Sequence, residues 1–267
     1  MLQMLRNAAK TAINHTGFAV VRATPNSNAY LVNRLTGLGA HLFGLDPETR
    51  AFLTFCVDRI ETSKSQIMQD LFVLFILREK RNGYFVDFGA TDGVELSNSL
   101  LLETGYDWNG IVAEPARGLH DQIAANRNCS IEYDCVAERS GETVMFNETV
   151  GLGLSTIESF TDSDSNSEAR VNGDRYEVKT ISLNDLLERH NSPTKIDYLS
   201  IDTEGSEYSI LSMFDFENYQ PAVVTVEHNF VDAKRLKLFE LLSSHGYKRR
   251  FETLSMFDDW YVHPRAM

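Results

Sequence analysis

The chain has 267 residues, of which 43% are hydrophobic, and its formal net charge of −13 gives a pI of about 5.0. These totals suffice for one large domain with a buried core, and they argue against the basic surface that nonspecific nucleic-acid binding requires. Three cysteines without C-x-x-C spacing favour a reducing compartment, and the apolar run Leu71–Leu77 is too short to span a bilayer. Since no cleavable leader is recognisable, a cytoplasmic protein is expected.

Residues 1–62 are expected to form an N-terminal arm or lid ahead of a single domain at 63–267. Met1–Ala12 has the pattern of a short amphipathic helix, and Asp46-Pro47-Glu48 is typical of a helix start with proline in the first turn. A further helix is predicted over Ser65–Lys80, because its apolar residues share one face and its basic residues collect at its end.

The stretch from Tyr84 to Gly93 predicts a strand buried on both faces, then a glycine turn, then a helix over Val94–Glu103. Its pattern is D-x-G-x-x-x-G, whereas dinucleotide-binding proteins carry G-x-G-x-x-G. Asp87 places a carboxylate at the strand end, where a pyrophosphate would be repelled. A cationic nucleoside such as S-adenosylmethionine suits that carboxylate better, through its sulfonium and α-amino groups.

Two further predicted strands bring acids to the same edge. The strand Asn109–Glu114 ends in a carboxylate that can accept hydrogen bonds from both hydroxyls of a ribose. After the helix Ala116–Asn126, the strand Ser130–Val136 carries Asp134, which is either a partner of an adenine amino group or a solvated loop acid. The glycine turn and Glu114 together favour a nucleoside site over a plain structural turn.

Residues 140–179 interrupt the α/β rhythm with a segment rich in serine and aspartate, predicted to be an irregular insertion between short strands near Thr143–Asn147 and Tyr176–Ile181. Such a segment is either a lid or a solvated linker. The alternation of strands and helices then resumes, and the chain ends in a predicted antiparallel hairpin. The predicted helices are Ser182–His190, Ser206–Phe214 and Ala233–Ser244, and the predicted strands are Ile196–Ile201, Ala222–Val226, Tyr247–Thr253 and Met256–Val262.

Acids gather where two of these strands end. Asp202 and Glu204 follow Ile196–Ile201, and Glu227-His228-Asn229 follows Ala222–Val226. Ligands of open α/β sheets bind at the carboxyl ends of the strands, and acids there would be unfavourable without partners. This edge is therefore the predicted site.

Four segments resemble motifs of the FkbM-type methyltransferase family, namely Gly83–Gly93, Thr180–Leu187, Ile196–Glu207 and Glu227-His228. The resemblance covers residues 65–262 and implies a class I methyltransferase with an α/β, Rossmann-like fold. That fold is a seven-stranded, mostly parallel sheet flanked by helices, here with a helical N-terminal arm and an antiparallel C-terminal hairpin. The resemblance also implies S-adenosylmethionine as methyl donor and O-methylation of a hydroxyl on a sugar, glycan or polyketide-like small molecule. Thr91 departs from the pattern, since many methyltransferases carry a glycine there.

Methyl transfer to a hydroxyl needs a base or a metal, because a hydroxyl is a weak acid. His228 is one candidate base, with Asp202 near the methyl donor and Glu204 on the acceptor side, unless His228 is a structural histidine. The other candidate is Mg²⁺ held by Asp202, Glu227 and Asn229, whose oxygen atoms match its ligand preference.

The residues expected to contact the cofactor lie in the first motif and at the strand ends that follow it. They are Asp87, Phe88, Gly89, Ala90, Gly93, Ser97, Asn98, Glu114, Pro115, Asp134, Cys135 and Asp202. Two other functions stay open: a catalytically silent binding module of the same fold, and an NAD-dependent oxidoreductase, which the missing G-x-G-x-x-G disfavours. The expected partner is a small-molecule or glycan acceptor and not a nucleic acid, and a homo-oligomer is left open.

Overall fold

The computed structural model describes residues 46–149, 153–164 and 166–266. The chain divides into two units, Met1–Glu61 and Thr62–Met267. Within the described ranges, no helix is long and apolar enough to cross a membrane.

The first unit contains α3 (Pro47–Val57), which begins where the sequence predicts. Asp46 caps this helix, because its Oδ1 accepts hydrogen bonds of 3.0 Å from the amides of Glu48 and Thr49. The helix expected over Met1–Ala12 lies outside the described residues.

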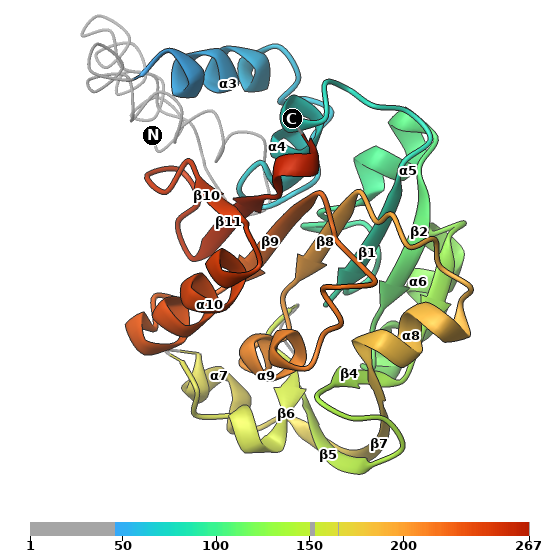
Figure 1. The fold of residues 1–267 in the computed structure, drawn as a ribbon. Coiled ribbons are helices and arrows are strands. Elements are labelled where there is room, and N and C mark those ends of the chain that lie inside the picture. Colours follow the sequence, from blue (N-terminus) through green and yellow to red (C-terminus); the bar gives the residue numbers. More distant parts are fainter. Residues whose placement is uncertain (1–45, 150–152, 165, 267) are drawn as a thin grey trace, which may run out of the picture. The chain divides into compact units, whose positions relative to one another are not determined.

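A seven-stranded sheet with the order β10-β11-β9-β8-β1-β2-β3 forms the centre of the second unit (Figure 1). The strands from β9 to β3 run parallel, and β11 pairs antiparallel with both β9 and β10. The predicted mostly parallel sheet with an antiparallel hairpin at its end is therefore confirmed. Its strands are β1 (Tyr84–Phe88), β2 (Asn109–Ala113), β3 (Ser130–Glu132), β8 (Tyr198–Ile201), β9 (Val223–Glu227), β10 (Lys248–Arg250) and β11 (Asp258–Val262).

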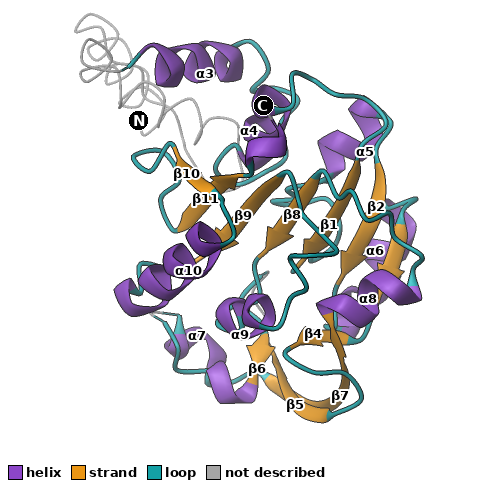
Figure 2. Cartoon of the chain, viewed as in Figure 1, coloured by secondary structure: helices purple, strands orange, loops and turns teal. Residues whose placement is uncertain are grey.

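Helices cover both faces of this sheet, with α8, α9 and α10 on the face nearer the viewer and α5 and α6 on the other (Figure 2). Both faces of the inner strands are thus buried, which explains why these strands are mostly apolar rather than alternating between apolar and polar residues. The helices are α4 (Gln69–Ile76), α5 (Leu100–Tyr106), α6 (His120–Asn126), α7 (Ser167–Arg170), α8 (Leu183–Arg189), α9 (Glu207–Ser212) and α10 (Asp232–Ser244), and the 3-10 turns are η2 (Arg117–Leu119), η3 (Glu158–Phe160) and η4 (Pro264–Ala266).

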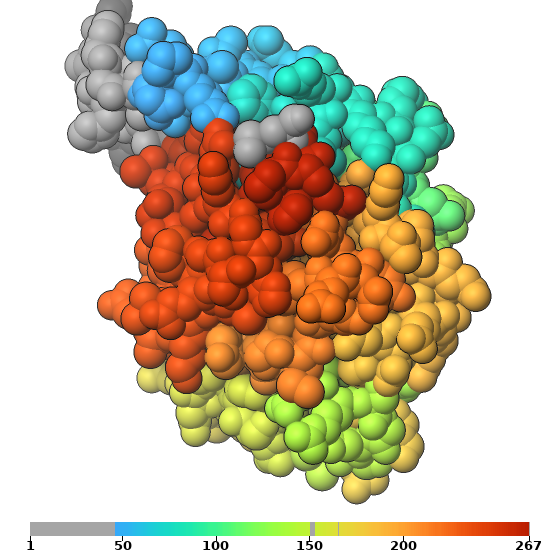
Figure 3. Space-filling model, viewed as in Figure 1, coloured from blue at the N-terminus to red at the C-terminus, as the bar shows by residue number. Residues whose placement is uncertain are grey.

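The insertion, residues 140–179, is more regular than predicted. It contributes most of a second sheet with the order β4-β7-β5-β6, which occupies one end of the second unit (green to yellow in Figure 3). The expected strand Ser130–Val136 is in fact two strands that belong to different sheets, because the chain leaves the main sheet after Glu132. The strands of the small sheet are β4 (Cys135–Ala137), β5 (Thr143–Glu148), β6 (Thr156–Ile157) and β7 (Asp174–Ser182).

Two predicted helices are shorter than the sequence suggests. The helix expected over Val94–Glu103 begins only at Leu100, and residues 89–99 form a loop. The Asp92 carboxylate accepts hydrogen bonds of 2.8 Å from the amides of Val94 and Glu95, which fixes a turn there, and Leu96 has a φ of 59°. The helix expected over Ser65–Lys80 is limited to α4, because Met68 has a φ of 77° at its start.

Candidate active site

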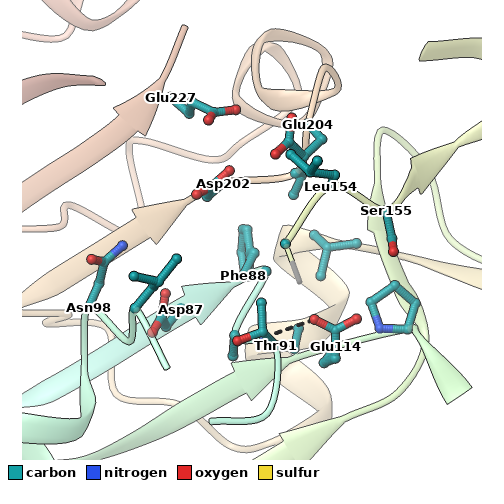
Figure 4. Close-up of a pocket in the computed structure, with 18 of the residues that line it drawn as sticks. Asp87, Phe88, Thr91, Asn98, Glu114, Leu154, Ser155, Asp202, Glu204 and Glu227 are labelled. Atoms are coloured by element: carbon teal, nitrogen blue, oxygen red, sulfur yellow. Dashed lines mark hydrogen bonds between the residues drawn. The ribbon is translucent and has the colours of Figure 1, made fainter. Parts of the chain in front are cut away.

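A cavity of about 360 Å³ lies at the carboxyl ends of β1, β2, β8 and β9, the edge that the sequence predicts (Figure 4). Strand β1 lies between β2 and β8, so the loops after β1, β2 and β8 meet at this edge. Leu154 and Ser155 of the insertion also line the cavity, so the insertion forms part of its wall.

Gly89 lets the loop after β1 (residues 89–99, the first loop) pass close to the loop after β8. Its φ is 76°, and a Cβ atom built on it would lie 2.0 Å from the backbone oxygen of Asp202. A side chain at position 89 would therefore force the two strand ends apart. This close approach explains why the glycine follows β1 directly.

Glu114 connects the ends of β1 and β2. Its Oε2 accepts a hydrogen bond of 2.9 Å from the Thr91 amide (Figure 4), and its Oε1 accepts one of 2.8 Å from the Ala116 amide. Thr91 has a φ of 49°, so Glu114 holds the first loop in a left-handed conformation that a non-glycine residue rarely adopts. Burial raises the pKa of Glu114 to about 7, even though both backbone amides favour the carboxylate.

Polar side chains from the first loop complete this side of the cavity. Ser99 donates to Asp87 Oδ2 at 2.5 Å, and Asn98 donates through Nδ2 to Ser200 Oγ at 3.0 Å. Burial raises the pKa of Asp87. Asn98 Oδ1 and Asp202 Oδ1 are buried and accept no hydrogen bond from the described residues. Both atoms belong to residues that line the cavity, so they are acceptors available to a bound donor.

Three carboxyl groups meet at the end of β8 and β9. One carboxylate oxygen from each of Asp202, Glu204 and Glu227 lies within 4.8 Å of the others. Three negative charges at this spacing repel one another strongly in a buried site. Burial, followed by the nearby acids, raises the pKa of Asp202 to about 8, that of Glu204 to about 9, and that of Glu227 well above its usual range.

Arg170 of the insertion is fully buried beside this acidic cluster (Asp202, Glu204 and Glu227). Its guanidinium donates to Glu204 Oε2 at 2.6 Å and forms two hydrogen bonds with the Asp164 carboxylate, at 2.9 and 3.0 Å. It also donates to the backbone oxygens of Leu154 and Thr161. One side chain thus connects the insertion to the cavity wall.

The structure does not bring His228 to the cavity, contrary to its expected place on the acceptor side. Only 1% of its surface is exposed, and it does not line the cavity. Its Nδ1 accepts a hydrogen bond of 3.0 Å from the Phe230 amide, so the neutral ring carries its proton on Nε2, which donates to the Asp258 backbone oxygen at 3.1 Å. Both ring nitrogens are therefore occupied, as expected of a structural histidine.

Two further predicted residues also lie elsewhere. Asp134 pairs with Arg189 at 2.8 Å and does not line the cavity. Of its two predicted roles, that of a solvated loop acid therefore fits better than contact with an adenine. Gly93 packs beside Arg127 and is likewise not part of the lining. The predicted residues that do line the cavity are Asp87, Phe88, Gly89, Ala90, Ser97, Asn98, Glu114, Pro115, Cys135, Asp202, Glu204, Glu227 and Asn229.

Comparison with models of protein families matches residues 87–249 to the methyltransferase FkbM domain. The chain belongs to the FkbM methyltransferase family. The matched segment runs from β1 to β10 and contains the acidic cluster and the insertion. Membership of the family implies that the chain uses S-adenosylmethionine.

Solved methyltransferases are similar to this FkbM methyltransferase at low identity. A precorrin-6y C5,15-methyltransferase from Geobacter metallireducens is 12% identical, with a TM-score of 0.40, and the match covers 76% of this chain and 89% of that one. A methyltransferase from Geobacter sulfurreducens is 13% identical, with a TM-score of 0.34, and the match covers 85% and 96% of the two chains. No curated protein matches the sequence.

The cavity of this FkbM methyltransferase fits the cofactor that its family implies. The α-ammonium group of S-adenosylmethionine is a hydrogen-bond donor. Asn98 Oδ1 and Asp202 Oδ1 are buried acceptors that receive no hydrogen bond from the described residues, so they can accept one from this group. Glu114 offers a carboxylate for ribose hydroxyls. The apolar side of the cavity suits an adenine ring and is formed by Ala113, Leu119, Cys135, Val136 and Phe146.

Proposed function

We propose that this FkbM methyltransferase transfers a methyl group from S-adenosylmethionine to a hydroxyl of a sugar, glycan or polyketide-like small molecule. The observation that carries the proposal is the acidic cluster of Asp202, Glu204 and Glu227 at the cavity. Carboxylates accept hydrogen bonds from hydroxyls and can remove their protons. A cavity built around acids therefore suits a hydroxyl acceptor.

The bound cofactor supplies an electrophilic methyl group on a sulfonium. The chain's own residues do the rest: Glu114 holds the ribose, Asp202 and Asn98 accept from the α-ammonium group, and the first loop aligns the donor. Alignment of two reactants supplies several kcal/mol of the rate enhancement.

Glu204 takes the role of base in this proposal, in place of His228. Its pKa is raised to about 9 by burial and by the charge of Asp202, so its carboxylate is a stronger base than an ordinary glutamate. Because neighbouring carboxyl groups titrate together, the acidic cluster shares its protons, and one ionised member is available to accept the proton of the acceptor hydroxyl.

Magnesium binding at this cluster stays a prediction, with Glu204 in place of Asn229 as the third ligand. Glu204 now stands beside Asp202 and Glu227, whereas Asn229 presents its amide nitrogen to Glu227 at 2.6 Å and to Glu204 at 3.1 Å. A divalent ion there would acidify a hydroxyl bound to it. Activity that is lost with a chelator and restored by Mg²⁺ would favour this version, and activity indifferent to chelator would favour the carboxylate base.

Calorimetry with S-adenosylhomocysteine and NAD, followed by mass analysis of glycosides incubated with methyl-labelled cofactor, tests the proposal. We expect binding of S-adenosylhomocysteine, no binding of NAD, and label on a hydroxyl oxygen. Binding without any transfer would indicate the silent binding module, and binding of NAD alone would indicate the oxidoreductase.

A further inference from the structure

Phe230 is an exposed aromatic residue at the rim of the cavity. It lines the cavity, yet 67% of its surface is exposed, more than that of any other large hydrophobic residue described. It is the third residue after Glu227, which ends β9 and belongs to the acidic cluster. The described residues therefore leave most of this ring uncovered at the rim of the cavity.

The backbone that presents Phe230 is strained. Asn229 and Phe230 have φ angles of 50° and 57°, and two consecutive non-glycine residues in this region are unusual, especially when one is aromatic. Such conformations persist only where surrounding contacts enforce them, and they concentrate at sites that hold ligands.

His228 and Phe257 enforce this conformation. The Phe230 amide donates to His228 Nδ1, whose ring is fixed on its other side by the Asp258 backbone oxygen. The amides of His228 and Asn229 both donate to the Phe257 oxygen, at 2.8 and 3.1 Å. A buried histidine and the Phe257 carbonyl oxygen thus hold the backbone that carries this exposed ring in one conformation.

The charges around the ring restrict what can bind there. No lysine or arginine is found among the described residues that line the cavity, whereas six acids line it, namely Asp87, Glu95, Glu114, Asp202, Glu204 and Glu227. Arg170 faces Glu204 from outside the lining and is already engaged by Asp164. An acceptor that carried a carboxylate or phosphate near its reacting hydroxyl would find no lysine or arginine among the described lining residues to neutralise it.

We propose that Phe230 is the acceptor platform of this enzyme, and that it binds one apolar ring face of an uncharged, polyhydroxylated acceptor whose hydroxyls reach the acidic cluster. The proposal rests on the methyltransferase function proposed above. Carbon-bound hydrogens of a sugar ring pack on the aromatic face, while hydroxyls at the ring edge form hydrogen bonds with the carboxyl groups. His228 is then a positioning residue, because it acts through Phe230.

Saturation-transfer NMR with matched pairs of glycosides tests this platform in the presence of S-adenosylhomocysteine. The probes are methyl glucoside and methyl galactoside with their uronate counterparts, and the variants are Phe230→Ala and Phe230→Tyr. The matched control is Phe239→Ala, which removes an exposed ring on α10, away from the cavity.

We expect saturation transfer from the protein to the ring hydrogens of the neutral glycosides. The saturation-transfer signal of the uronates should be at least tenfold weaker. Phe230→Ala should remove the signal, whereas Phe230→Tyr and Phe239→Ala should keep it. Calorimetry should show unchanged binding of S-adenosylhomocysteine in every variant, which separates this result from the cofactor function. Equal signals from Phe230→Ala and wild type, a preference for uronates, or no signal from any neutral glycoside would overturn the proposal.

Discussion

Arg170 and Glu204 form a buried ion pair between α7 of the insertion and the loop after β8, with 2.6 Å between Nη2 and Oε2. The Arg170 side chain is 0% exposed and the Glu204 side chain 6%. Since Asp164 binds the same guanidinium, one cation serves two carboxylates. This pair makes the insertion a structural part of the cavity rather than a solvated linker.

Removal of the cation should destabilise the fold. Arg170→Met leaves two buried acids without their partner, and we expect a loss of about 3 kcal/mol in the free energy of unfolding measured with urea. Arg175→Met is the matched control, because Arg175 pairs with Glu158 at the surface, where such pairs contribute at most about 1 kcal/mol. Equal losses in both variants would contradict a special role for Arg170.

Glu114→Ala should weaken binding of S-adenosylhomocysteine by about 1–3 kcal/mol, because charge-assisted hydrogen bonds to the ribose are lost. The variant also removes the acceptor that holds the Thr91 amide, so the first loop loses its support. Calorimetry measures the change. Asp134→Asn should leave the affinity unaltered, since Asp134 lies outside the cavity lining, and an unaltered affinity in folded Glu114→Ala would show that Glu114 does not hold the ribose.

The variant His228→Ala distinguishes between two roles of His228, that of a catalytic base and that of a positioning residue. A base would lower kcat by roughly 10²–10⁴-fold. Because both ring nitrogens bind the protein backbone, we expect instead a raised KM for the acceptor, with kcat reduced less than tenfold and cofactor affinity kept. Steady-state kinetics with an identified acceptor decide between them, and a kcat loss at constant KM would restore His228 as the base.

The acidic cluster should make stability depend on pH. Its members have folded pKa values raised above those of an unfolded chain, to about 8 for Asp202 and about 9 for Glu204, so the folded state holds more protons than the unfolded state between about pH 4 and 9. Stability contributed by these groups is present at low pH and is lost as the pH rises through that window. We expect the Tm of the ligand-free protein to fall from pH 6 to pH 9, and Glu204→Gln to flatten the fall. If the Tm of Glu204→Gln fell with pH as steeply as that of the wild type, the raised pKa of Glu204 would not be a source of the pH dependence.

The sequence predicts the strands of the main sheet well because an apolar run that ends in an acid is typical of a buried parallel strand in an α/β chain. Helical periodicity alone fails where side chains bind backbone amides two or three residues along the chain. The helix expected from Val94 is replaced by a turn on the Asp92 carboxylate, and Ser97 Oγ accepts from the Leu100 amide where α5 begins. Helical periodicity gives no sign of either contact.

Tertiary contacts decide where the predicted site residues lie. His228 follows a strand end, as a catalytic residue would, but the carbonyl of Asp258 that binds it comes from a strand thirty residues later. Arg170 lies in a polar segment without periodicity, and it is buried against Asp164 of the same segment and Glu204 from the loop after β8. Phe230 could have been noticed as an aromatic residue beside the acids of the last motif.

The parallel pairing of β4 with β7 brings the two ends of the insertion together, since Cys135 stands opposite Thr180 and Ala137 opposite Ser182. The free-energy cost of closing a loop grows only slowly with its length once its ends are fixed. Segments of other lengths and sequences could therefore be exchanged between these two strands without disturbing the main sheet. Such an exchange would remodel the part of the cavity wall that Phe146, Leu154 and Ser155 form, while the strands of the main sheet keep their pairing.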